Sequence, residues 1–393
     1  MRVFYISNSF IPSNKANSIQ VMKMCQAFSR LVGEVVLFCR KSGEQGVDNI
    51  FQYYGVADSF EVRRLEVPKV RMLSRFMYAR EIMKQIRRES GPSLVYGRDY
   101  YVMGLMCLMG INLPMSLEIH QPPEDRVQAA LQGIIFRHKS FRRLVVISQA
   151  LADEYVRLYG KDLEGKISVA HDGADFHQIP TQMLSNPTYE YKGDRFRLGY
   201  IGSLYPGKGM EMIARLAPLA PEHEFHVVGG TPEEVARWKS EVPADNLVFY
   251  GFVSPDKVYD YMGTFDAMLA PFQPNVLVGD RKVDIARWMS PLKIFEYMAG
   301  GKPIIASNLP VLQEVLTDNE NALLTDAADP HGWVAKINRL ADDEALRRKL
   351  GQQAQKDFFS HYTWEKRAEI LLHTLQPRQT IREKVQGITT PNR

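Results

Sequence analysis

Lys293 and Glu296 lie three residues apart in the segment SPLKIFEYMAGGKPIIAS. Ser290 is a favourable helix N-cap and Pro291 fits the first helical position, so a short helix is predicted to start here. The free N–H groups and the dipole of such a start hold an anion such as a phosphate. A carboxylate one turn further in accepts hydrogen bonds from a sugar diol. The same spacing also fits an exposed helix with an ordinary ion pair, and the segment alone leaves both interpretations open.

A glycine-rich loop with one lysine, GSLYPGKG at 202–209, follows an expected strand at 197–201 and opens a helix. Small residues let backbone N–H groups approach a phosphate, and Lys208 adds positive charge. The loop lacks the GxxxxGK[ST] spacing of a Walker A motif. It therefore predicts an anion site of another type.

His120 ends the strand expected at 113–120 and precedes a Gln-Pro-Pro loop. In parallel sheets this edge faces the ligand crevice, which separates His120 from the other eight histidines. A lone histidine is more often structural, so that interpretation also stays open. The loop after the first expected strand lies at the same edge and carries Ala16, Asn17 and Ser18.

Strands and helices alternate along the chain, which predicts parallel sheets with right-handed crossovers. At 393 residues the chain is too long for one ordinary core. A polar, proline-containing stretch at 180–191 marks the expected boundary between two doubly wound units. The predicted division is a first domain at 1–185, a second at 190–358, a last helix at 360–376 and a flexible tail at 377–393.

Composition excludes several classes. The net charge of +4 is too mild to indicate nucleic acid as a partner. Three scattered cysteines without a CxxC pair predict neither a zinc site nor a disulfide framework, and they fit a reducing, cytoplasmic location. The apolar stretch 100–119 is interrupted by Asn112, Pro114 and Glu118, so a buried helix followed by a strand is predicted rather than a membrane span.

Residues 63–88 are rich in arginine and lysine, with apolar residues interleaved. A basic amphipathic helix can lie on an anionic membrane surface at the inner face of the plasma membrane. A solvated helix packed on the sheet is the alternative, and the acidic residues of the stretch favour it slightly.

Five segments together are typical of one family: SPLKIFEYMAGGKPIIAS, IGSLYPGKG, VISQALADEY, HDGAD and GFVSPDKVYDYM. In these segments the sequence resembles the retaining glycosyltransferases of family 4, from Met1 to about Leu375. The resemblance implies the GT-B fold, in which two Rossmann-like domains face each other across a cleft. It also implies a nucleotide-sugar donor.

The resemblance assigns roles to individual residues. Lys208 would neutralise the diphosphate leaving group, Glu296 would bind the ribose hydroxyls, and His120 would contact the sugar or support the reacting centre; these three are the expected catalytic residues. The expected donor-binding residues are Gly202, Ser203, Lys208, Gly229, Phe252, Val253, Arg281, Trp288, Ser290, Pro291, Leu292, Lys293 and Glu296.

Three positions depart from the family pattern. Trp288 stands where the family often has a second glutamate that contacts the donor sugar; Asp284 or Arg287 could replace that carboxylate, or Trp288 could stack on the sugar ring. Ser203 stands where an arginine is frequent, and Arg281 could supply the missing charge. The first-domain loop has Ala16–Ser18 in place of a glycine pair.

These features predict an enzyme that moves a sugar from a UDP- or GDP-sugar to a glycan or lipid-linked acceptor in bacterial surface polysaccharide or glycolipid synthesis. No Asp-x-Asp pair is present to chelate a diphosphate-bound cation, so no metal and no cofactor are expected. Front-face attack with retention of configuration is implied by the family alone. Two alternatives stay open: a GT-B protein that binds the nucleotide sugar without transfer, and a GT-B sugar-nucleotide epimerase.

Overall fold

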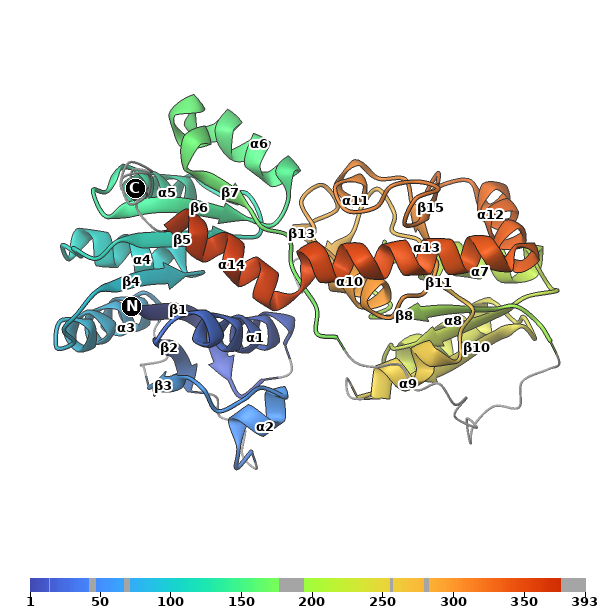
Figure 1. Ribbon diagram of the computed structural model, residues 1–393, viewed down its shortest axis with the longest axis horizontal. Coiled ribbons are helices and arrows are strands. Elements are labelled where there is room, and N and C mark those ends of the chain that lie inside the picture. Colours follow the sequence, from blue (N-terminus) through green and yellow to red (C-terminus); the bar gives the residue numbers. More distant parts are fainter. Residues whose placement is uncertain are drawn as a thin grey trace, which may run out of the picture.

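The computed structural model describes residues 1–13, 15–41, 47–66, 71–176, 194–254, 257–278 and 283–375. These residues form two α/β units that lie side by side along the long axis of the molecule (Figure 1). The first unit is drawn in blue to green, and the second in light green to orange. The predicted two-unit architecture is confirmed. The expected boundary at 180–191 and the tail 377–393 lie outside the described residues.

The first unit is built on a seven-stranded parallel sheet of order β3-β2-β1-β4-β5-β6-β7. Its strands are β1 Arg2–Ile11, β2 Glu34–Lys41, β3 Glu61–Leu65, β4 Ser93–Gly97, β5 Met115–Ile119, β6 Phe141–Val146 and β7 Ile167–Val169. Its helices are α1 Ala16–Leu31, α2 Ile50–Tyr54, α3 Arg71–Ile86, α4 Tyr100–Leu108, α5 Arg126–Arg137 and α6 Gln149–Tyr159. Phe4 and Ile6 of β1 enter one core cluster and Val3 and Tyr5 the other, so both faces of the sheet are buried.

The second unit has a six-stranded parallel sheet of order β10-β9-β8-β11-β14-β15. Its strands are β8 Arg197–Ile201, β9 Glu224–Val228, β10 Leu247–Gly251, β11 Ala267–Ala270, β14 Ile304–Ser307 and β15 Leu323–Thr325, with a small hairpin of β12 Leu277–Val278 and β13 Val283–Asp284. Its helices are α7 Met210–Leu219, α8 Pro232–Glu241, α9 Val258–Gly263, α10 Leu292–Ala299, α11 Pro310–Gln313, α12 Pro330–Asp342 and α13 Glu344–Asp357. Tyr200 and Leu198 lie in one core cluster, and Ile201 lies in the other.

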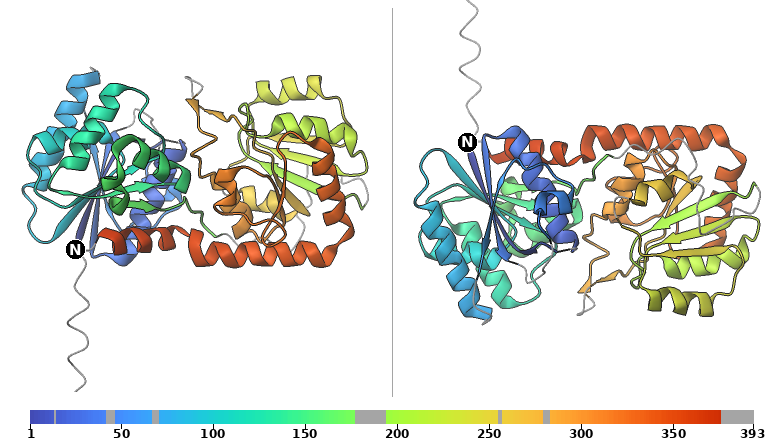
Figure 2. Two further views of the ribbon diagram at one scale, coloured as in Figure 1. Left: turned by 90° about the horizontal axis from the view of Figure 1, so that it is seen from above. Right: turned by 90° about the horizontal axis from the view of Figure 1, so that it is seen from below.

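The last helix, α14 Trp364–Leu375, belongs to the core of the first unit although it follows the second in sequence. Trp364, Ala368 and Leu371 are buried in the same cluster as Tyr5 and residues of β6. Helices α13 and α14 run in series from one unit to the other, as both views of Figure 2 show. The chain therefore crosses between the units twice.

The apolar stretch at 100–119 folds as predicted into a buried helix, α4, and a strand, β5. The basic stretch divides into β3 and α3, and α3 packs on the sheet through Tyr78, Ile82 and Ile86. Among the helices of the described ranges, none combines the length and the apolar character that a membrane span requires.

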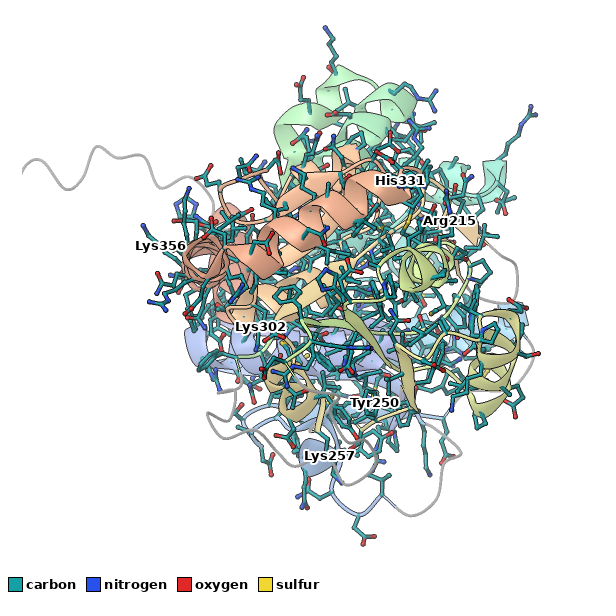
Figure 3. The ribbon with its side chains drawn as sticks, turned by 90° about the vertical axis from the view of Figure 1, so that its right-hand side faces the viewer. Arg215, Tyr250, Lys257, Lys302, His331 and Lys356 are labelled. Carbon is teal, nitrogen blue, oxygen red and sulfur yellow. The ribbon has the colours of Figure 1, made fainter. Side chains whose placement is uncertain are left out.

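Gly300 and Gly301 end α10. Gly301 adopts a φ of 63°, and the chain turns directly into β14. Lys302, labelled in Figure 3, donates from Nζ to the carbonyl oxygens of Gly263 at 3.1 Å and Phe265 at 2.6 Å. Burial lowers the pKa of Lys302 to about 8. The end of α10 is therefore fastened to the turn between α9 and β11.

Candidate active site

The glycine-rich loop between β8 and α7 is held by backbone contacts. The Tyr200 hydroxyl donates to the carbonyl oxygens of Ser203 at 2.7 Å and Lys208 at 3.2 Å. A Cβ on Gly229 would lie 2.0 Å from the carbonyl oxygen of Gly202, so the loops after β8 and β9 touch through bare backbone. This close approach explains why glycine stands at position 229, and Gly202 itself adopts a φ of 148°, which favours glycine.

Two lysines lie against the same aromatic ring. Lys293 Nζ lies 3.8 Å from the ring centroid of Tyr200 and 4.8 Å from that of Phe272, and Lys208 Nζ lies 5.9 Å from the Phe272 centroid. Burial lowers the pKa of both ammonium groups, and the charge of Lys208 lowers that of Lys293 further. No described residue offers a hydrogen-bond acceptor to Lys293 Nζ. One half-buried and one buried lysine beside the same ring fit an anion with more than one negative charge.

Lys293 is 8% exposed, so the interpretation of the segment as an exposed helix with a surface ion pair is wrong. The helix predicted to carry the pair is α10, and its hydrophobic residues bury it against the sheet. The ammonium group lies beside Gly202 of the glycine-rich loop, against the rings of Tyr200 in β8 and Phe272 after β11. The two parts of the predicted anion site therefore meet.

Glu296 lies one turn further along α10 and is half-buried. Burial raises the pKa of its carboxyl group to about 6, the positive charge of Lys293 opposes this, and the negative charge of Asp175 adds to it. The group is therefore mostly ionised at neutral pH and acts as an acceptor for hydroxyl donors. Asp175 belongs to the first unit and pairs with Lys23 at 2.6 Å, so Glu296 faces the other unit.

The predicted N-cap role of Ser290 is wrong. Pro291 occupies the cap position of α10, and no described side chain caps the helix. Ser290 Oγ instead accepts a hydrogen bond at 2.9 Å from the backbone N–H of Asp172 in the first unit. The serine thus joins the two units, and no described side chain caps the first N–H groups of α10.

His120 follows β5, at the carboxyl end of the first sheet. Its Nε2 lies 2.6 Å from Glu118 Oε1, and its Nδ1 lies 3.3 Å from Arg98 Nη2. Burial and the charge of Arg98 lower the pKa of the imidazole, so it is neutral at pH 7. Arg98 also donates to Gln20 at 2.7 Å, and Gln20 donates to Asp172.

Glu118, His120 and Asp172 bring three potential metal-ligand atoms within 4.8 Å of one another. Arg367 lies 3.1 Å from Glu118 and 3.9 Å from Asp172. Because two arginines already balance the two carboxylates, this donor set does not fit a metal ion. The absence of a metal and of a cofactor stays a prediction.

The units meet beside the site through polar contacts. Ser148 Oγ donates to the carbonyl oxygen of Trp288 at 3.0 Å. The carboxylate of Glu314 accepts from the first N–H groups of α6, at 2.6 Å from Gln149 N and 3.0 Å from Ala150 N. A carboxylate at a helix N-terminus is favourable, so this contact stabilises the relative position of the units.

Trp288 packs against the core cluster of the first unit, with the Arg287 guanidinium 4.5 Å from its ring. Asp284, one of the suggested substitutes for the missing glutamate, accepts from the backbone N–H groups of Val276 at 2.9 Å and Ala286 at 3.0 Å. Trp288 therefore contributes to the contact between the units, and Asp284 shapes its own loop.

The other predicted positions are spread around these groups. Ser203 is exposed, Phe252 is 76% exposed after β10, and Val253 is half-buried. Ala16 and Asn17 are exposed at the start of α1, whereas Ser18 is buried and donates to the carbonyl oxygen of Lys15 at 2.8 Å. Arg281 lies outside the described residues.

Several residues of the site were not predicted. Glu118 could have been found, because it precedes His120 by two positions and shares its face of the strand. Arg98 follows β4, whose carboxyl end lies beside that of β5. The role of Arg367 could not be predicted from nearby residues, since it lies 249 positions from its partner Glu118.

Two family models match the chain. One described as "Glycosyltransferase Family 4" matches residues 18–178, and one described as "Glycosyl transferases group 1" matches residues 195–343. The first lies within the first unit and the second within the second. A D-inositol 3-phosphate glycosyltransferase of Paenarthrobacter aurescens is 25% identical over 408 aligned positions, which cover 96% of this chain and 95% of the relative.

Solved structures share the fold at low identity. A crystal structure of Anabaena HepE in complex with UDP has a TM-score of 0.69 at 14% identity and covers 95% of this chain and 99% of its own. A glycosyltransferase from Rickettsia africae has a TM-score of 0.73 at 11% identity and covers 95% and 97%. These similarities establish the GT-B fold. With the two family models, they show that the chain is a glycosyltransferase and belongs to glycosyltransferase family 4.

Proposed function

We propose that the protein transfers a sugar from a nucleotide-sugar donor, with a UDP-sugar as the first candidate, to a glycan or lipid-linked acceptor. The observation that carries this proposal is the pair Lys208 and Lys293 on one aromatic ring, beside the first turn of α10. A diphosphate carries more than one negative charge, which two neighbouring lysine cations would neutralise. The UDP in the Anabaena HepE complex supports uracil as the base.

The reaction would proceed without a metal. Negative charge develops on the diphosphate as the sugar leaves, and fixed cations and helix N–H groups stabilise that charge most in a site from which water is excluded. Lys208 is half-buried and Lys293 is buried, and both lie against aromatic rings before the donor binds, so they need little rearrangement during the reaction. We therefore expect turnover without an added metal ion.

The remaining roles follow from position. Glu296, half-buried and ionised, would accept hydrogen bonds from the ribose hydroxyls, and Phe252 and Val253 would lie at the base. His120 would act at the sugar from the first unit. Retention of configuration, with attack on the same face that the diphosphate leaves, is proposed from family membership. Trp288, at the contact between the units, leaves the donor-sugar hydroxyls without the usual carboxylate.

The donor proposal predicts a base-specific thermal stabilisation. In a thermal-shift screen of UDP, GDP, ADP, CMP, dTDP and their common sugars, uridine nucleotides should raise the melting temperature. A ligand at 100 times its dissociation constant adds about 2.7 kcal/mol to the free energy of unfolding. Lys208→Ala should abolish the shift, because it removes one of the two cations on the diphosphate.

Each outcome of this screen is informative. A shift with a different base would correct the donor class, and no shift with any nucleotide would contradict the phosphate site. A strong shift without product across many acceptors would favour a binding protein that has lost transfer. Conversion of the donor by the purified protein alone would favour an epimerase.

We also propose that α3 lies on an anionic membrane surface. Leu73 is 49% and Phe76 48% exposed on this helix. Further along it, Arg80, Lys84 and Arg87 line an open pocket of about 500 Å³ together with Met83 and Met109. Exposed apolar groups with nearby cations are typical of interfacial helices, and such a surface would bring a lipid-linked acceptor to the enzyme.

Vesicle co-sedimentation should show this contact. The protein should bind vesicles that contain anionic lipid at low salt, and binding should fall with salt because surface attraction is screened. Each cation near the surface is worth about 1 kcal/mol, so combined Arg80→Glu and Lys84→Glu should reduce binding by more than about tenfold. Arg348→Glu, on exposed α13, should have no such effect. Binding that depends on neither anionic lipid nor salt would contradict the proposal.

A further inference from the structure

Glu118 is a fully buried carboxylate at the carboxyl edge of the first sheet. Its Oε1 accepts hydrogen bonds from His120 Nε2 at 2.6 Å and from Arg367 Nη2 at 3.1 Å. Its Oε2 accepts from the hydroxyl of Tyr96 and from Arg367 Nη1, the latter at 3.4 Å. Although burial alone would raise it, the charges of Arg367 and Arg98 hold the pKa of Glu118 well below its usual range. The group is therefore a permanent anion that only accepts hydrogen bonds.

Arg367 comes from α14, the helix that returns from the far unit. It is 1% exposed, and its Nε donates to the carbonyl oxygen of His171 at 3.0 Å. A guanidinium with this many fixed contacts has one orientation. Removing it would leave Glu118 buried without its main counter-charge, which is costly in a low-dielectric interior.

The partners of His120 determine which ring nitrogen carries the proton. Glu118 can only accept, so the nitrogen that faces it, Nε2, must be protonated. Arg98 can only donate, so the nitrogen that faces it, Nδ1, must carry a lone pair. Both contacts demand the same tautomer of the neutral ring.

We propose that Glu118 and Arg367 are positioning residues for His120, which fix its imidazole as the Nε2–H tautomer and leave Nδ1 as an acceptor for a substrate hydroxyl. Nδ1 is the ring nitrogen that no carboxylate holds, and a hydroxyl of the donor sugar or the acceptor would replace the Arg98 N–H there. This inference rests on the proposed role of His120 at the reacting centre. The last helix would then be a part of the active site.

NMR of protein labelled with ¹⁵N-histidine tests the tautomer without substrate, with His120→Asn used to assign the signal. In the wild type, Nε2 should be protonated and Nδ1 unprotonated at pH 6–8, with the Nε2–H proton protected from solvent exchange. Glu118→Gln should weaken that hydrogen bond, so the proton should exchange faster. Turnover should fall at least about tenfold, as when the partner that orients a catalytic histidine is changed, while KM for the donor stays within about threefold.

Variants of Arg367 test the contribution of the last helix. Arg367→Met should lower turnover as Glu118→Gln does, and Arg367→Lys should recover part of it because it keeps the charge. Glu365→Ala is the matched control on the same helix, since it breaks the exposed pair with Arg30 and leaves the His120 network intact. If Arg367→Met does not fold, the near-isosteric Glu118→Gln variant still tests whether the network positions His120.

Two results would overturn the inference. One is a proton on Nδ1 in the wild type, and the other is wild-type turnover in Glu118→Gln. Neither result contradicts the proposed function, because that proposal is tested by the nucleotide-induced thermal shift. Conversely, if the wild type shows no thermal shift with any nucleotide, the proposed donor site is contradicted, and the NMR result for His120 is unaffected.

Discussion

Lys293→Met should lower turnover by on the order of 10²–10³-fold while making the protein more stable. The ammonium group lies buried against Tyr200 and has no described acceptor, and its lowered pKa shows that the folded protein disfavours its charge. A methionine of similar length removes that cost, so the free energy of unfolding should rise by about 1–3 kcal/mol. Steady-state kinetics and urea unfolding measure the two effects.

Lys356→Met is the matched control, because Lys356 is exposed on α13, away from the site (Figure 3). It should change neither turnover nor stability by more than about 0.5 kcal/mol. A Lys293→Met variant that loses stability together with activity would mean that the lysine is a structural cation. A variant that keeps activity would mean that Lys208 suffices.

Trp364→Ala should lower the free energy of unfolding by about 3–5 kcal/mol. The indole is 5% exposed within the core of the first unit, and its removal leaves a cavity between α14 and the sheet. Equilibrium urea unfolding followed by circular dichroism should show an earlier transition. Turnover should fall as well, because the same helix carries Arg367.

The control for this variant is Ile370→Ala, a substitution on the same helix at a side chain that is 41% exposed. It should leave the unfolding midpoint within the range of ordinary surface changes. An equal loss in both variants would contradict the assignment to the buried indole, since alanine has the higher helix propensity and neither substitution weakens the helix itself.

The architecture could be predicted because it depends on local patterns. The strand at residues 197–201, the buried helix and strand within 100–119 and the last helix all follow from apolar periodicity, which tertiary contacts then reinforce. The same holds for the two segments of the predicted anion site, since loop-to-helix junctions carry their glycines and lysines within a few residues.

The features that could not be predicted from the sequence depend on tertiary contacts. Ser290 has the features of a helix cap, but its hydroxyl oxygen instead accepts a hydrogen bond from a backbone N–H of the first unit. Lys293 and Glu296 have the spacing of a surface pair, but the aromatic faces of Tyr200 and Phe272 draw the lysine inward. Arg367 reaches Glu118 across most of the chain, and no local propensity encodes such a contact.

The return of α14 to the first unit has a consequence for synthesis on the ribosome. Domains generally fold as they emerge, the N-terminal one first. Here all seven strands of the first sheet have been made by Val169, but the apolar surface around Phe28 and Val145 is covered by residues that are translated almost 200 positions later. We expect the nascent first unit to expose that surface, and to depend on chaperones for its protection, until the second unit has been translated and the last helix docks.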